Sequence, residues 1–357
     1  MVSARARTGE LNSLALLRAE LQAGGAVLTD LTDSNPTRHG LLLPEVGEAL
    51  ARAAARTREY QPDPRGLPAA REALAAHFGG SPADYWLTAS TSEAYSWLFA
   101  LLCDPGEAVA IPSPGYPLIE PIARLCGIRA VSYPLHYVPG GWLLDVPRLR
   151  ETAGGSAVRA AVSVFPGNPT GAFLELPDVG KPQICDEVFA AFGLDGEAPP
   201  IPQADFHLNG LSKLLCAPHL KLGWIHAPGL PPGPQSALDT IADSFLSVNQ
   251  LAAAALAELL QLVPKSVENT RVRLRVNLAT AGELFGEPFR VRSCAGGWTA
   301  LIEAPEPPPL PELMRKWGLF AHPGWFYDLP DTVLAISLLP EPDQFRAGME
   351  RLRAALA

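Results

Sequence analysis

The sequence predicts an α/β fold: a large domain on a doubly wound, mostly parallel sheet, joined to a smaller α+β domain. Short apolar runs typical of buried strands lie near residues 85–88, 108–112, 128–133, 158–165, 183–185, 205–208 and 222–226. Helix-length stretches separate the first of these runs, as in a doubly wound sheet. The chain has 357 residues, which exceeds one comfortable hydrophobic core, so two domains are expected.

The character of the sequence changes after Pro234. Long helical patterns are expected at about 236–262 and 265–285. A smaller mixed unit follows, with strands near 289–291, 298–303 and 333–338 and helices near 310–317 and from about 343 onward. Proline-rich segments at 228–234 and 305–311 separate these parts.

Composition excludes several classes of protein. Hydrophobic residues make up 48% of the chain and charged residues 18%, so disorder is not expected. The net charge of −9 argues against nucleic-acid or anionic-membrane partners. There is no apolar run of eighteen residues and no recognisable signal peptide. The five cysteines are an odd number without metal-ligand spacing, which favours a reduced, cytoplasmic location.

The most informative motif is Asn209-Gly210-Leu211-Ser212-Lys213, which places Lys213 twenty-seven residues after Asp186 and eight before Lys221. A lysine that condenses with an aldehyde must spend time neutral, and an apolar setting lowers the pKa of its amine. A buried upstream carboxylate suits the same chemistry, because it keeps the ring nitrogen of pyridoxal phosphate protonated. The alternative for this motif alone is a surface lysine after a turn.

Further motifs occur in a fixed order along the chain. They are Tyr60, the turn Ser90-Thr91-Ser92 before a helix expected at about 93–103, Tyr116 after Pro114-Gly115, and Asn168 in the turn 165–171 that follows a buried strand. With Asp186, Lys213 and Lys221, this ordered set resembles the class I/II pyridoxal-phosphate-dependent aminotransferases of fold type I over essentially the full length of the chain. The resemblance implies that residues 1–45 and 263–357 form the small domain and residues 46–262 the large one.

The resemblance also implies how pyridoxal 5'-phosphate would be bound. Ser90, Thr91 and Ser92 would hold the phosphate at a helix N-terminus, although a plain N-cap explains the same residues. Lys221 stands where the family usually has an arginine, and Gly210 replaces a serine that often contacts the phosphate, whereas Ser212 is kept.

Other positions would contact the pyridine ring. Tyr116 would stack on it, Asn168 would donate to its phenolic oxygen, and Asp186 would pair with its nitrogen, while Glu187 is expected to point to the other face of its strand. Phe189 departs from the family, which commonly has a tyrosine there. Tyr60 would reach the phosphate of a neighbouring subunit, which implies a homodimer. The alternatives are a turn aromatic for Tyr116, a turn residue for Asn168 and a core tyrosine for Tyr60.

Two departures bear on the substrate. Ala335 stands where the family usually has the arginine that grips the α-carboxylate of the substrate; Arg38, next to Asn35, and Arg65 are the nearest replacements by chain position. The stretch 231–260 contains no Lys or Arg, where aspartate-type enzymes carry an arginine for a second carboxylate. A dicarboxylic substrate is therefore disfavoured. The connection from Asn168 to Asp186 is also too short for the usual crossover helix.

These observations together predict an aminotransferase that moves an amino group from a donor, not a dicarboxylic one, to a 2-oxo acid through a Schiff base with Lys213. A β-lyase, decarboxylase or racemase of the same fold would use the same residues, and so would a non-catalytic pyridoxal-phosphate-binding domain. No metal site is expected, because the histidines His39, His207, His219, His226 and His322 show no paired ligand spacing.

Overall fold

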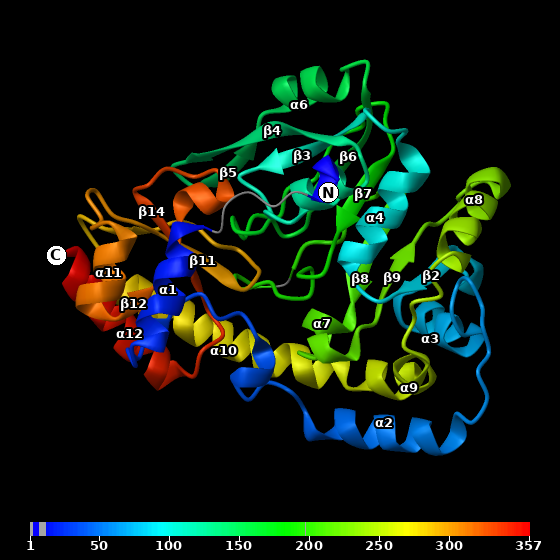
Figure 1. Ribbon diagram of the computed structural model, residues 1–357, viewed down its shortest axis with the longest axis horizontal. Coiled ribbons are helices and arrows are strands. Elements are labelled where there is room, and N and C mark those ends of the chain that lie inside the picture. The colour runs from blue at the N-terminus through cyan, green and yellow to red at the C-terminus, as the bar shows by residue number, and fades with distance from the viewer. Residues whose placement is uncertain (1–2, 7–11, 197) are drawn as a thin grey trace.

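A computed structural model describes residues 3–6, 12–196 and 198–357. Its centre is an eight-stranded sheet with strand order β2-β9-β8-β7-β6-β3-β4-β5 (Figure 1). In chain order the strands are β2 (Tyr85–Thr88), β3 (Ala108–Ser113), β4 (Arg129–Val138), β5 (Gly141–Leu144), β6 (Val158–Val164), β7 (Gln183–Asp186), β8 (Phe206–Gly210) and β9 (Gly223–His226). Strands β8, β7, β6, β3 and β4 run parallel, so the mostly parallel sheet predicted from the sequence is confirmed.

Helices cover both faces of this sheet, because strands send alternate side chains to opposite sides. Trp86 of β2 joins the core on one face, whereas its neighbours Tyr85 and Leu87 join the core on the other. The flanking helices are α4 (Thr91–Leu102), α5 (Ile119–Leu125) and α8 (Pro232–Asp243) on the first face, and α3 (Pro68–Phe78) and α6 (Val146–Ala153) on the second. This is the doubly wound arrangement expected.

The parallel connection from β6 to β7 contains no helix, as its length predicts. Residues 165–182 form turns, bends and backbone without regular secondary structure instead. The turn that ends at Gly171 is held against the C-terminal part of the chain, since a Cβ built on Gly171 would lie 2.6 Å from the sulfur of Cys294. The φ angle of Gly171 is 66°, so both space and backbone conformation require glycine there.

A smaller unit is built on an antiparallel four-stranded sheet of order β10-β11-β14-β13. Its elements are β10 (Arg290–Val291), β11 (Thr299–Glu303), α11 (Leu310–Trp317), β12 (Leu319–Phe320), β13 (His322–Pro323), β14 (Val333–Ser337) and α12 (Pro342–Leu356). The N-terminal segment joins this unit, because β1 (Thr29–Asp30) pairs in parallel with β12 and α1 (Ser13–Ala23) packs on α11. Arg18 adds an ion pair of 2.6 Å with Asp30.

The single helix expected at 236–262 was wrong. The structure has α8 and a separate α9 (Gln250–Gln261), because the backbone of Leu246 turns into a left-handed conformation (φ 43°) and the side chain of Asn249 caps the second helix. Helix α10 (Val263–Leu284) follows and runs along one edge of the molecule from α9 to the small unit (Figure 1).

The remaining elements are short or peripheral. They are α2 (Pro44–Arg56), α7 (Leu211–Leu214) and the 3₁₀ turns η1 (Ala4–Ala6), η2 (Pro36–Arg38), η3 (Pro82–Asp84), η4 (Pro218–Leu220) and η5 (Gly324–Tyr327). Helix α2 packs along α9. Among the described residues, no helix is both long and apolar enough to cross a membrane.

Candidate active site

A cavity of about 220 Å³ opens at the carboxyl ends of β6, β7 and β8, beside the N-terminus of α4. This end of the strands is where open α/β sheets bind ligands. The cavity is lined by Ser90, Thr91, Ser92, Tyr116, Val164, Asn168, Asp186, Val188, Phe189, Gly210, Ser212, Lys213, Pro218, Lys221, Leu222 and Gly223. The fold therefore brings together every cofactor-binding residue expected from the sequence except Tyr60.

Lys213 lies on α7, the short helix that follows β8 directly. Its amine is 4.9 Å from the ring centre of Trp298 and 5.3 Å from that of Phe189. Burial lowers the pKa of Lys213 below its ordinary value, and the negative charge of Asp186 opposes this shift. The lysine is thus held in surroundings that favour a neutral, nucleophilic amine.

Asp186 ends β7 with only 3% of its surface exposed. Burial raises the pKa of Asp186 to about 6, although hydrogen bonds to its carboxylate oppose the shift. These bonds come from the backbone N–H of Val188 at 3.3 Å and from the hydroxyl of Tyr95 at 3.0 Å. A buried carboxylate held in this way suits a cationic partner.

Tyr95 reaches Asp186 in the structure, a contact that the sequence did not reveal. It lies on α4, is almost fully buried, and donates to Asp186 across ninety-one residues of sequence. The local sequence shows only a tyrosine on the apolar face of a helix. A tyrosine that merely packs in the core gives the same pattern.

The Tyr95→Phe variant is expected to lower kcat by about one to two decades, because a hydrogen bond to a charged group contributes roughly 1.5–3 kcal/mol. Cofactor affinity and KM should change little, since the phosphate end of the cavity is untouched. Steady-state kinetics and cofactor titration measure the two effects separately. A parallel loss of cofactor affinity would instead indicate a general packing defect.

The N-terminus of α4 shows the N-cap that was one of the two alternatives, and it also borders the cavity. Ser90 is the N-cap, and its side chain accepts from the N–H of Glu93 at 3.2 Å. Thr91 and Ser92 begin the helix and line the cavity, where the first backbone N–H groups of a helix lack intrahelical partners. Lys221 lines the cavity as well. An anion at this end would meet helix N–H groups, short hydroxyl side chains and one cation.

Four expected residues lie outside the cavity. Tyr60 is 69% exposed and lines a separate hollow. Arg65 forms a two-point ion pair with Asp239 at 2.6 and 2.7 Å, and Arg38 pairs with Asp33 at 3.3 Å. Asn35 caps η2 through the N–H of Thr37. In this structure, therefore, neither arginine is directed at the cavity.

Ala335 lies buried in β14, opposite Leu301. Its neighbours in this apolar cluster include Trp142, Leu301, Tyr327, Leu329 and Val333. Arg292 belongs to the same cross-strand row, since its N–H donates to the carbonyl of Leu301. This arginine, which the sequence did not single out, is already paired with Glu303 at 3.3 Å and lies over the ring of Tyr137.

The cavity residues fit pyridoxal phosphate. The helix N-terminus and Lys221 suit a phosphate, and the buried Asp186 suits a protonated ring nitrogen. Lys213 and Tyr116 line the same cavity. The amine of Lys213 suits the aldehyde of the cofactor, and the ring of Tyr116 suits its aromatic ring. One hydrogen-bond donor is missing, because Phe189 stands where the resemblance leads one to expect a tyrosine hydroxyl.

Comparison with known proteins agrees with this fit. The family described as "Aminotransferase class I and II" matches residues 28–285, which is more than half of the chain. The chain belongs to the class I and II aminotransferases, which are pyridoxal-phosphate-dependent transferases.

The relatives differ in what they act on. Histidinol-phosphate aminotransferase of Symbiobacterium thermophilum is 28% identical over 335 residues, covering 83% of this chain and 87% of that protein. Nicotianamine aminotransferase 1 of Oryza sativa subsp. japonica is 29% identical over 184 residues, covering 45% of this chain and 36% of the rice protein. Thus the match spans about half or less of the length of several curated relatives.

Solved structures confirm the fold class. Alanine aminotransferase from Pyrococcus furiosus superposes with a TM-score of 0.86 at 22% identity over 99% of both chains. A double mutant of Thermus thermophilus aspartate aminotransferase gives 0.83 at 22% identity over the whole of both chains. Likeness at this level of identity establishes the fold and leaves the amino donor open.

Proposed function

We propose that the protein is an aminotransferase that takes an amino group from a neutral amino acid and passes it to a 2-oxo acid. The observation that carries this proposal is that Lys213 and Asp186 line one cavity together with the N-terminus of α4. Lys213 is the amine that would bind the cofactor covalently, and Asp186 is the carboxylate that would keep the cofactor ring electron-withdrawing. The N-terminus of α4 would bind the cofactor phosphate.

Each residue has a separate task. When bound, pyridoxal phosphate supplies an aldehyde that captures an amino group and a ring that withdraws electrons from the substrate's α-carbon. Lys213, as a neutral amine, would accept the proton of the substrate's α-carbon and deliver it to the aldehyde carbon (C4′) of the bound cofactor. Asp186 holds the proton of the ring nitrogen by charge, and Tyr95 fixes the position of that carboxylate. Thr91, Ser92 and Lys221 bind the phosphate.

The surroundings of the cavity favour a donor without a second carboxylate. Among its described lining residues, Lys213 and Lys221 are the only basic side chains, and both have tasks toward the cofactor. The place of the carboxylate-binding arginine is taken by Ala335 in an apolar cluster. Phe189 and Trp298 add aromatic surface beside Lys213.

Aspartate is expected to be a poor donor, and a neutral or aromatic amino acid or a non-α amine a better one. A charge-assisted contact contributes roughly 1.5–3 kcal/mol, so the absence of two such contacts lowers specificity by about two to four decades. A half-reaction screen that follows conversion of the cofactor to its amine form measures this. If aspartate proves the fastest donor, an arginine must reach the site, and Arg292 is the first to replace.

Product analysis separates this function from its neighbours in the fold. With a panel of amino acids and 2-oxoglutarate, an aminotransferase releases the 2-oxo acid of the donor and forms glutamate. A decarboxylase would release CO₂, a β-lyase would release its leaving group, and a racemase would return the mirror-image amino acid. No turnover with any donor would favour a binding protein.

The protein is expected to be a homodimer in which Tyr60 contacts the cofactor phosphate of the partner subunit. The support is that Tyr60 is exposed in the single chain and does not line that chain's own cavity. Light scattering of the cofactor-bound protein should give about twice the 38.0 kDa of one chain. The Tyr60→Phe variant should bind cofactor more weakly without changing this mass. A monomer that retains cofactor would contradict the proposal.

We also propose a cytoplasmic location, which rests on the cysteines. All five are free thiols, and three of them, Cys103, Cys185 and Cys294, have pKa values raised by burial to between about 11 and about 12. Free thiols are typical of reducing compartments.

A further inference from the structure

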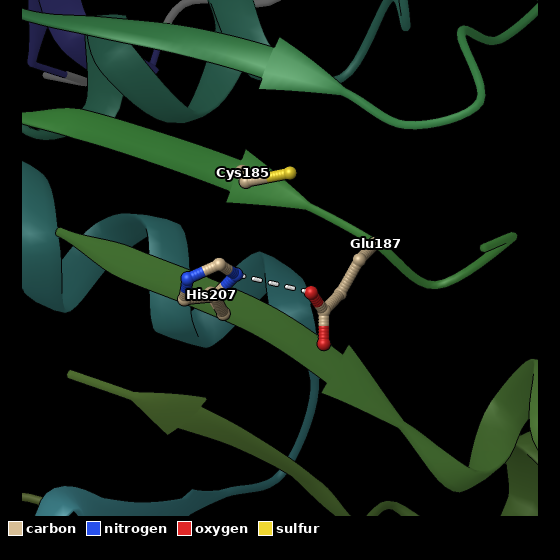
Figure 2. Close-up of side chains that lie close together, drawn as sticks. All are labelled: Cys185, Glu187 and His207. Atoms are coloured by element: carbon tan, nitrogen blue, oxygen red, sulfur yellow. Dashed lines mark hydrogen bonds and ion pairs between the residues drawn. The ribbon is translucent and has the colours of Figure 1, made fainter. Parts of the chain in front are cut away.

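A second group of side chains, each able to bind a metal ion, lies behind the cofactor cavity, on the other face of the sheet. Cys185 is opposite His207 in the parallel register of β7 and β8. Glu187 comes two residues after Cys185, so its side chain falls on the same face, while Asp186 between them faces the cavity. Figure 2 shows the three side chains together, with Glu187 and His207 joined by a polar contact.

The distances within this group approach those of a metal site. Nδ1 of His207 is 3.1 Å from Oε2 of Glu187, and one ligand atom from each of the three residues lies within 4.8 Å of the other two. Around tetrahedral zinc, nitrogen and oxygen ligands are roughly 3.3 Å apart, and the separation is roughly 3.6 Å when one ligand is sulfur. A contraction of about 1 Å by side-chain rotation would therefore close the group on an ion.

Charge and burial suit a divalent cation. A thiolate, a carboxylate and a neutral imidazole carry two negative charges together, so a divalent ion makes the buried site neutral. Cys185 is fully buried, whereas Glu187 and His207 retain slight exposure, which leaves a side from which an ion and a water ligand can enter.

A supporting side chain is also present. The side-chain amide of Asn209 lies 3.4 Å from Oε1 of Glu187, the carboxylate oxygen that does not face His207. Such outer contacts fix the orientation of a ligand and are typical of metal sites. The sequence did not predict the group, because His207 and Glu187 are twenty residues apart and meet only through strand pairing.

We propose that Cys185, Glu187 and His207 form a three-ligand site for a zinc-like divalent cation, with water as the fourth ligand. The mixture of one sulfur, one nitrogen and one oxygen donor favours zinc over calcium or magnesium, which prefer oxygen alone. The ion would tie β7 to β8 directly behind Asp186. Its role is to fix the strand that carries Asp186, outside the transfer reaction itself.

The test uses the cofactor-bound protein, freed of metal with a chelator and titrated with Co²⁺ as a spectroscopic probe. One equivalent should bind and produce a thiolate-to-cobalt charge-transfer band in the difference spectrum, and Zn²⁺ should displace it. The Cys185→Ser variant should lose this band, and His207→Gln should weaken binding at least about tenfold. Cys103→Ser is the matched control, because Cys103 is another buried thiol away from the group.

X-ray absorption of the zinc-loaded wild-type protein makes the test independent of whether the variants fold. One sulfur neighbour at about 2.3 Å and lighter neighbours at about 2.0–2.1 Å are expected. Substoichiometric binding, a zinc shell without sulfur, or a cobalt band that survives in Cys185→Ser would each overturn the proposal. None of these readouts depends on transferase activity, so they do not bear on the proposed reaction.

Discussion

The Lys213→Ala variant is expected to lose turnover by about two to four decades or more, since a positioned general base alone contributes 10²–10⁴-fold. In the proposed reaction Lys213 also forms the covalent link to the cofactor, so the variant should retain cofactor only by non-covalent contacts. Its absorption spectrum should lack the band of the lysine-linked cofactor. Steady-state kinetics and absorption spectra measure the two losses.

Lys181→Ala is the matched control, because Lys181 lies in the connection before β7 and does not line the cavity. The Lys181→Ala variant should keep both the absorption band of the lysine-linked cofactor and the wild-type turnover. Borohydride reduction of the wild-type protein followed by peptide mapping should place the cofactor on Lys213. A label on Lys181 or Lys221 would refute the assignment.

The Asp186→Ala variant should lose at least about a hundredfold in turnover while still binding cofactor. In the proposed reaction the buried carboxylate stabilises the protonated ring nitrogen of the cofactor, and removing one such electrostatic contact costs about 10²–10³-fold. The proposed phosphate contacts at α4 and Lys221 would be unaffected, so cofactor retention should persist. The rate of a single half-reaction measures the loss of turnover. The cofactor content per chain measures whether cofactor is retained.

Asp178→Ala serves as the control for this substitution, since Asp178 is an exposed carboxylate in the connection between β6 and β7. Near-normal turnover in Asp186→Ala would contradict the assignment. Glu187 could not easily take over, because its carboxylate faces His207 on the opposite side of the sheet.

The sequence predicted most of the cavity because the residues that line it lie at the ends of strands, at the starts of helices and in turns. These positions can be recognised from the local sequence. Asp186 ends a strand, Ser90 caps a helix, Asn168 lies in the turn after β6, and Lys213 lies in the short helix that follows β8. Parallel strands place such positions at one edge of the sheet, so local signals suffice to bring them together.

What the sequence missed depends on contacts between distant segments. Trp298 reaches Lys213 from the small unit, Tyr95 reaches Asp186 from α4, and His207 meets Glu187 through strand register. The break between α8 and α9 depends on the left-handed backbone conformation of Leu246. Leucine rarely adopts this conformation, so the sequence does not indicate it. Strand β5 was missed as well, because it exists only as the partner of β4.

The pairing of β1 with β12 has a mechanical consequence. It fuses the N-terminal segment to the C-terminal unit, so the backbone crosses to the large sheet twice, once before α2 and once along α10. Helix α10 is continuous over 22 residues, or about 33 Å, and resists bending. The N-terminal segment and the C-terminal unit therefore form one body through the β1–β12 pairing, and a displacement of either part is transmitted to the other through that pairing.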